Sequence, residues 1–232
     1  MQRKIASISQ LLKVPSICSL CKQYHGNKLA VCEECIHYFS MLEHKCDYCA
    51  FPLPDSTYSV CGTCSLQRPA FDKVITAYRF EEPLRTLLHE FKYEEGLYLL
   101  SLIADLMVRA FTTEDAKTEC LIPIPMHPQR IRSRGFNQSV ELVKYLSKII
   151  LRPYDLTLCT KIKNTPPLAS LDAKARKKHI KNAFHCKTSP YQNVTLVDDL
   201  ITTGSTANEL AATLKQAGVL HVTVWSCART AR

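Results

Sequence analysis

Two adjacent carboxylates, Asp198 and Asp199, end an apolar run that begins at Val194. A short stretch of threonine, glycine and serine follows them, and beyond it apolar residues recur at helical spacing. Two charges at the end of a buried strand are costly unless something outside the strand binds them. The run therefore predicts a ligand site where the strand ends.

The stretch after the carboxylates has the composition of a phosphate-binding loop, with residues Thr202, Thr203, Gly204, Ser205 and Thr206. Its N–H groups and hydroxyls would converge at the N-terminus of the next helix, and glycine permits close backbone approach. The loop lacks the lysine of a P-loop. Carboxylates beside a phosphate suit hydroxyls, so we expect a ribose 5-phosphate. The alternative is a helix that is merely N-capped after a buried strand.

Eight of the twelve cysteines form four C-x-x-C pairs before residue 65. Two such pairs close a tetrahedral shell of four thiolates around zinc, which leaves no open position for a substrate. We therefore expect two structural zinc ions. The simplest ligand sets follow the sequence, although an interleaved arrangement would use the same residues. The ligands are Cys18, Cys21, Cys32 and Cys35 for one ion, and Cys46, Cys49, Cys61 and Cys64 for the other. Eight unrelated reduced thiols are the alternative. His25, His37 and His44 lie among the pairs, and we expect each to be solvent-exposed rather than a ligand.

From Ala70 onward, apolar segments alternate with helical patterns. This alternation predicts an α/β domain with a mainly parallel sheet, whose ligand sites lie beyond the carboxyl ends of the strands. A basic loop, 126–138, separates one strand from the next helix. Strands are expected at 74–80, 120–125, 156–162, 194–199 and 221–228. Helices are expected from Pro83 onward and at 97–111, 139–151 and 205–217.

The segment VTLVDDLITTGST, 194–206, resembles the signature of type I phosphoribosyltransferases. The resemblance implies that the loop binds the 5-phosphate of phosphoribosyl pyrophosphate (PRPP). It also implies that Asp198 and Asp199 engage the ribose hydroxyls, partly through Mg²⁺. No residue identifies an acceptor base, so turnover is not established by the sequence.

The chain is similar to the ComF family of bacterial competence proteins in the order of its segments. The cysteine pairs come first, followed by AFDKVITAYRF, then IPIPMHPQRIRSRGFNQS, and then the PRPP loop. The similarity covers almost the whole chain, and RGFNQ is especially characteristic. It implies a double zinc-ribbon module, 1–67, followed by a phosphoribosyltransferase-like domain, 68–232. The implied role is in DNA uptake during natural transformation, through handling of incoming single-stranded DNA.

The formal net charge of +9 suits polyanionic partners. Related phosphoribosyltransferases bind pyrophosphate with a loop where Arg134 lies, so we expect Arg134 to bind it, with Lys92 as a weaker candidate. We assign Arg130 and Arg132 to a solvated face. A basic run near residue 178 would fold onto pyrophosphate, follow a DNA backbone, or simply be exposed to solvent. The run comprises Lys174, Arg176, Lys177, Lys178 and Lys181.

Two other functions remain open. One is an active phosphoribosyltransferase of nucleotide salvage or synthesis, and the other is a regulatory module that binds PRPP without turnover. Besides PRPP and DNA, we expect other DNA-uptake or recombination proteins as partners. No apolar run reaches about 18 residues, and no secretion signal is visible. We therefore expect a cytoplasmic protein that is not integral to the membrane, with a peripheral position at its inner face left open.

Overall fold

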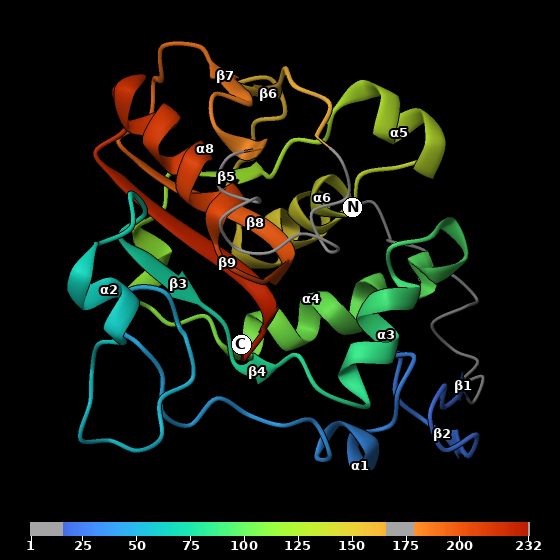
Figure 1. The fold of residues 1–232 in the computed structure, drawn as a ribbon. Coiled ribbons are helices and arrows are strands. Elements are labelled where there is room, and N and C mark those ends of the chain that lie inside the picture. Colours follow the sequence, from blue (N-terminus) through green and yellow to red (C-terminus); the bar gives the residue numbers. More distant parts are fainter. Residues whose placement is uncertain (1–15, 166–178, 232) are drawn as a thin grey trace, which may run out of the picture.

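The computed structural model describes residues 16–165 and 179–231 (Figure 1). Its centre is a parallel sheet in the order β3-β9-β8-β5, and β4 also pairs with β9. The prediction of a parallel-sheet α/β fold is thereby confirmed. The strands are β3 Lys73–Ile75, β4 Tyr78–Arg79, β5 Cys120–Pro123, β8 Asn193–Ile201 and β9 His221–Arg229.

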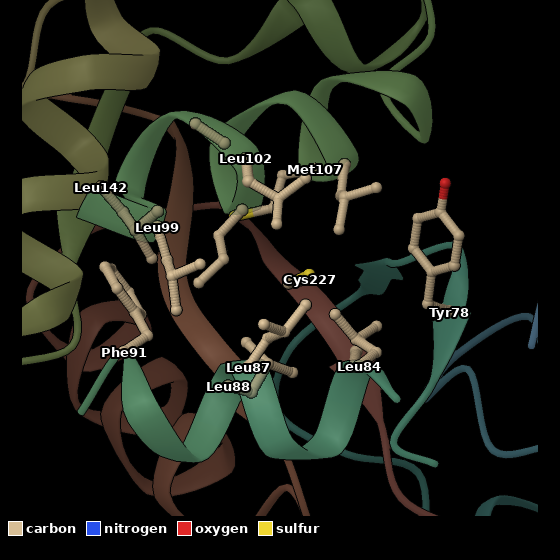
Figure 2. Close-up of a cluster of buried hydrophobic side chains, with 14 of the residues drawn as sticks. Tyr78, Leu84, Leu87, Leu88, Phe91, Leu99, Leu102, Met107, Leu142 and Cys227 are labelled. Atoms are coloured by element: carbon tan, nitrogen blue, oxygen red, sulfur yellow. The ribbon is translucent and has the colours of Figure 1, made fainter. Parts of the chain in front are cut away.

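Helices cover both faces of the sheet because side chains of β8 and β9 alternate between two cores. Val197 and Trp225 belong to one buried cluster, whereas Leu196 and Val224 belong to the other. The first cluster packs against α3 Leu84–Glu90, α4 Leu100–Arg109 and α6 Gln138–Ile150, and the second packs against α8 Ser205–Gln216. Figure 2 shows Leu84, Leu87 and Leu88 of α3 facing Leu102 and Met107 of α4, with Cys227 of β9 between them.

Two expected elements differ in the structure. The strand expected at 74–80 is interrupted, since β3 ends at Ile75 and β4 begins at Tyr78. Between the two strands, the Thr76 hydroxyl donates to the Cys227 carbonyl at 3.1 Å. The basic segment 126–138 is not only loop but contains a helix, α5 Pro128–Arg134. Proline suits its first turn, and the His127 ring caps it by accepting from the Gln129 N–H. No residue of α5 is buried, so it has no apolar periodicity to predict it.

The cysteine-rich segment packs onto the sheet-bearing part of the chain. Its short elements are β1 Ser16–Ile17, β2 Tyr24–His25, α1 Glu33–Ile36 and α2 Gly62–Leu66. Ile36 and Phe39 lie in the same buried cluster as the α3 and α4 side chains. The Leu42 N–H donates to the Ala77 carbonyl at 2.7 Å, and the Arg79 N–H donates to the Ser40 carbonyl at 2.8 Å. The boundary after residue 67 stays a prediction.

The remaining elements lie around the sheet. Two 3₁₀ helices, Glu94–Leu99 and Asp115–Lys117, flank α4. A separate antiparallel pair, β6 Cys159–Lys161 and β7 Phe184–Cys186, lies outside the main sheet. The expected strand at 156–162 is therefore shorter than expected. None of the described helices is long and apolar enough to cross a membrane.

Candidate functional site

Asp198 and Asp199 lie in β8, which extends to Ile201, two residues beyond the strand end that the sequence suggests. Asp199 is buried, and Asp198 is partly buried. The Ser139 hydroxyl donates to Asp198 Oδ1 at 2.9 Å, and the Asp199 N–H donates to the same oxygen at 3.0 Å. These two bonds fix the Asp198 carboxyl against the start of α6.

The segment RGFNQS, 134–139, contains the residues that begin α6 and cap its N-terminus. Asn137 accepts from the Ser139 N–H at 3.1 Å and so caps α6, while its amide donates to the Ile124 carbonyl at 3.1 Å. The cap joins α6 to the end of β5 and aims Ser139 at Asp198. Ser139 is a site residue that sequence reasoning missed, because only the fold brings it to the strand end.

The surroundings of Asp198 disfavour its negative charge. Burial, together with the Asp199 carboxylate, raises the pKa of Asp198 to about 8. Asp199 Oδ2 is buried and accepts no hydrogen bond, and the Lys92 ammonium lies 3.6 Å from it. A hard cation such as Mg²⁺ prefers carboxylate oxygens, so the paired carboxyls and the oxygen that accepts no hydrogen bond fit Mg²⁺. Lys92, expected as a weak pyrophosphate ligand, is placed here against the acidic pair.

The loop after β8 has the backbone that the glycine suggests. Gly204 has φ +75° and precedes α8, so its conformation is one that other residues adopt at a cost. The Thr203 and Ser205 hydroxyls lie 2.9 Å apart, and the Ser205 N–H donates to Thr203 Oγ1 at 3.3 Å. The loop therefore gathers hydroxyls and amides at the N-terminus of a twelve-residue helix, where an anion is favoured.

A cavity of about 670 Å³ lies beside α5, and its charged side chains are Arg130 and Arg134. These arginines are four residues apart and share a helix face. Burial, and then the charge of Arg134, lowers the pKa of Arg130. Arg132 is exposed, as expected, but Arg130 lines the cavity with Arg134 instead of lying on a solvated face. The other lining residues are Tyr93, Gln129, Ser133, Asn164 and Thr165.

Lys161 of β6 connects this cavity to the acidic pair. Its ammonium donates to Thr165 Oγ1 at 2.8 Å. Burial and the charge of Arg130 lower the pKa of Lys161 to about 8, against the opposing effect of Asp198. Sequence reasoning missed this residue because a single lysine in a short strand gives no signal of what it will face.

A second cavity, of about 600 Å³, lies between the loop 202–206 and the second cysteine cluster. Thr203, Gly204 and Ser205 line it from one side, and the segment 61–64 lines it from the other. Arg229, at the end of β9, joins the two walls, since its guanidinium donates to the Thr202 carbonyl and, at 3.0 Å, to the Cys49 carbonyl. The second cysteine cluster therefore borders the loop that we expect to hold phosphate.

The cysteines gather in the two sets that follow the sequence. Within each set the ligating atoms lie within 4.8 Å of one another, and no histidine belongs to either set in the described part of the chain. Cys21 and Cys32 Sγ lie 3.8 Å apart, and Cys49 and Cys61 Sγ lie 3.7 Å apart. Tetrahedral Zn–S bonds of about 2.3 Å place the sulfurs about 3.8 Å apart, so both sets fit zinc. The sets are Cys18, Cys21, Cys32 and Cys35, and Cys46, Cys49, Cys61 and Cys64.

The three histidines among the cysteine pairs differ in their exposure. His37 is exposed and His44 is partly exposed, but both ring nitrogens of His25 are buried without a hydrogen-bond partner, so exposure was a wrong prediction for His25. Lys181 is exposed, and its carbonyl accepts from Lys163 Nζ at 2.8 Å. The other members of the basic run lie outside the described residues, namely Lys174, Arg176, Lys177 and Lys178.

No protein-family model matches the chain. Competence protein F of Haemophilus influenzae is 33% identical over 216 residues, which are 88% of this chain and 93% of that protein. The DNA utilization protein YhgH of Escherichia coli K12 is 29% identical over 95% of this chain and 100% of its own length. Competence protein ComFC of Bacillus subtilis is 25% identical over 75% of this chain and 73% of its own length. Among solved structures, orotate phosphoribosyltransferase from Aeropyrum pernix matches with a TM-score of 0.36 and 15% identity, over 63% of this chain and 77% of that chain.

Proposed function

Because the chain belongs to the family of competence protein F and the DNA utilization protein YhgH, we propose that it is a PRPP-binding competence protein. Its role is in DNA uptake during natural transformation, where it handles incoming single-stranded DNA. Family membership supports the competence role. The residues at the end of β8 support PRPP as the small-molecule ligand.

The observation that carries PRPP binding is the buried Asp199 Oδ2, which accepts no hydrogen bond and faces the Lys92 ammonium at 3.6 Å, beside a partly buried Asp198 whose pKa is raised to about 8. Asp198 and Asp199 would hold Mg²⁺ and the ribose hydroxyls. Mg²⁺, when bound, neutralises these carboxylates and the pyrophosphate oxygens. The loop Thr202, Thr203, Gly204, Ser205 and Thr206 binds the 5-phosphate at the positive end of α8.

The pyrophosphate lies toward the basic cavity. Arg134 is the residue we assign to it, and Arg130 lines the same cavity and adds a second guanidinium. Lys161 extends the positive charge toward Asp198. A planar guanidinium binds two phosphate oxygens at once, which favours the arginines over the lysine for this contact.

Calorimetric titration with PRPP and Mg²⁺ tests the ligand. We expect heat of binding for the zinc-loaded chain, and none for Asp198→Asn combined with Asp199→Asn. Glu141→Gln serves as a matched control, because that carboxylate pairs with Lys144 at 2.8 Å and belongs to none of the proposed contacts with PRPP. Absence of heat with the unaltered chain would refute PRPP binding.

The same titration with single-stranded DNA present tests the second ligand. If DNA follows basic residues outside the PRPP site, the double aspartate variant still binds it, and the affinity falls steeply with salt. If DNA occupies the phosphate sites themselves, PRPP and DNA compete, and the apparent affinity for PRPP falls steadily as the DNA concentration rises, without reaching a plateau.

An active phosphoribosyltransferase is the second candidate, and the cavity of about 670 Å³ beside α5 favours it, because that volume exceeds what pyrophosphate alone would fill and gives room for an acceptor base. The chain's own groups would act by position and charge, with the loop anchoring the phosphate and Arg134 stabilising the departing pyrophosphate. Pyrophosphate release from PRPP with some base, abolished by the double aspartate change, establishes the enzyme. Binding without release, over a panel of bases, establishes a PRPP-sensing module instead.

We also propose a cytoplasmic location, with DNA-uptake or recombination proteins as partners and a peripheral position at the inner face of the membrane. Fractionation of cells during DNA uptake tests this. Recovery of the chain outside the cytoplasm and the inner membrane face would contradict it.

A further inference from the structure

Cys159 and Cys186 lie outside the two zinc sets and face each other across β6 and β7. They are direct partners in the antiparallel register, and the Lys187 N–H donates to the Leu158 carbonyl at 3.0 Å. This hydrogen bond brackets the cysteines, so theirs is a non-hydrogen-bonded pair, the kind with Cα atoms only about 4.5 Å apart. That separation lies within the range that disulfides span.

The two sulfurs lie 2.9 Å apart. This is closer than the two sulfur pairs described in the zinc sets, Cys21–Cys32 at 3.8 Å and Cys49–Cys61 at 3.7 Å. Among the described residues, no group of three or more ligating side chains includes Cys159 or Cys186. Two thiols alone do not complete a zinc shell, so covalent bonding suits this pair better than a metal.

We propose that Cys159 and Cys186 form a reversible redox site, at which a peroxide oxidises the two thiols to a disulfide that joins β6 to β7. Cys186 is partly exposed and Cys159 is buried, so the oxidant reaches Cys186 first. The hydrogen bond between the two sulfurs lowers the pKa of Cys186, whereas the same contact and burial raise the pKa of Cys159.

The oxidation of the two thiols by hydrogen peroxide proceeds in two steps. The Cys186 thiolate attacks the peroxide O–O bond, and hydrogen peroxide yields a sulfenic acid and, after protonation, one water. The Cys159 sulfur then attacks the sulfenic sulfur, its thiol proton leaves with the hydroxyl as a second water, and the S–S bond forms. The two thiols lose two electrons and two protons, which the peroxide accepts. A small-molecule thiol reverses the step by exchange.

The disulfide would act on the basic cavity through Lys161. Lys161 follows Cys159 by two residues, so the two side chains share a face of β6. Its ammonium donates to Thr165, which lines the cavity with Arg130 and Arg134. Joining the strands holds Lys161 in place and lowers the ordering cost of anion binding. This consequence rests on the proposed PRPP function, whereas the disulfide itself does not.

Peptide mapping without reductant tests the site. The full zinc-loaded chain is treated with graded hydrogen peroxide, and we expect a linked peptide pair carrying Cys159 and Cys186, about 2 Da lighter than the sum of the two thiol peptides. Dithiothreitol should restore the separate peptides. Cys159→Ser and Cys186→Ser each abolish the link, while Cys120→Ser, which removes a buried thiol outside the pair, leaves it intact.

Zinc release is followed in parallel, so that oxidation of the zinc ligands is recognised. Links from Cys159 or Cys186 to other cysteines, or sulfinic acid at Cys186 without the link, overturn the proposal. Mapping of the unaltered chain decides this even where a serine variant does not fold. As a separate arm, we expect the oxidised chain to bind inorganic pyrophosphate roughly two- to five-fold more tightly. Formation of the disulfide without this change refutes only its effect on the cavity.

Discussion

At the residue scale, Asp198 sets how the stability of the ligand-free protein depends on pH. Burial and the Asp199 carboxylate raise its pKa from 3.8 to about 8. Between these values the folded chain binds a proton that the unfolded chain does not. The free energy of unfolding therefore falls as pH rises through this window.

Asp198→Asn removes this loss, because asparagine resembles the protonated carboxyl and does not ionise. We expect the melting temperature of the variant to exceed that of the parent at pH 8 by on the order of 5 °C. At pH 4 the two should melt at similar temperatures. Calorimetric melting without ligand at both pH values measures this, and an equal difference at both would contradict the assignment.

Asp155→Asn is the matched comparison with the opposite sign. Burial opposes ionisation of Asp155, but hydrogen bonds from Thr157 and Leu158 outweigh it and lower the pKa. A lowered pKa contributes stability above the unfolded value that is lost as pH falls. We therefore expect Asp155→Asn to lower the melting temperature at pH 8.

Gly204 has a positive φ that residues with a side chain adopt only at a cost. A Cβ added there would approach the Phe71 ring no closer than 3.7 Å, so space is available and the φ of +75° is the obstacle. We expect Gly204→Ala to cost about 1 kcal/mol in unfolding free energy. PRPP heat should weaken as well, because the loop would relax away from φ > 0.

Gly62→Ala is the control for this change. An added Cβ there meets nothing within 4 Å, and the residue begins α2. Urea unfolding should show little loss for Gly62→Ala. Equal losses for the two alanine variants would show that the Gly204 backbone is not the cause.

At the element scale, α1 and the segment after it fasten the cysteine-rich part to α4 and the sheet edge. Arg109 of α4 donates to Glu33 of α1 at 2.8 and 3.1 Å, but both side chains are more than a third exposed. Phe39 is buried and packs edge-on against Tyr78, with ring centroids 6.1 Å apart. Apolar burial should therefore outweigh the ion pair.

The prediction is a large difference between two alanine changes. Phe39→Ala should lower the unfolding free energy by about 3 kcal/mol or more, and Arg109→Ala by about 1 kcal/mol or less. Trp225, the single tryptophan, is fully buried in β9, so its fluorescence reports the sheet during urea unfolding. Comparable losses would mean that the ion pair, not the core, joins the two parts.

The elements also show what a sequence can predict. β8, β9, α6 and α8 were predictable because each carries a run or a period of apolar residues that the core requires. No residue of α5 is buried, so no apolar periodicity predicts this helix. Without the helix, the sequence gives no reason to place Arg130 anywhere but in solvent. The acidic pair and the loop are contiguous in sequence and were visible as a motif. Ser139, Lys161 and Arg229 reach the site only through tertiary packing, so spacing alone gave no sign of them.

In the whole molecule, the two cysteine clusters are placed differently with respect to the loop 202–206. The second cluster shares a cavity with the loop, and Arg229 bridges the Cys49 carbonyl to the Thr202 carbonyl. Cys18 and Cys32 of the first cluster belong instead to the core beneath α3 and α4. Zinc at the second site should therefore be coupled to PRPP binding, and zinc at the first site to stability.

Loss of one ligand in each cluster separates these roles. We expect Cys49→Ser to release one zinc and weaken PRPP binding on the order of tenfold, because Arg229 loses the fixed carbonyl that holds it against the loop. Cys21→Ser should also release one zinc, yet leave PRPP affinity within about twofold while lowering the melting temperature. Zinc counted with a colorimetric chelator, calorimetry with PRPP and Trp225 fluorescence provide the three measurements. Of the two clusters, only the second lines the cavity that the loop also lines, so the two variants should differ in PRPP affinity. Equal weakening of PRPP binding by both variants would mean that the clusters act through global stability rather than through the loop.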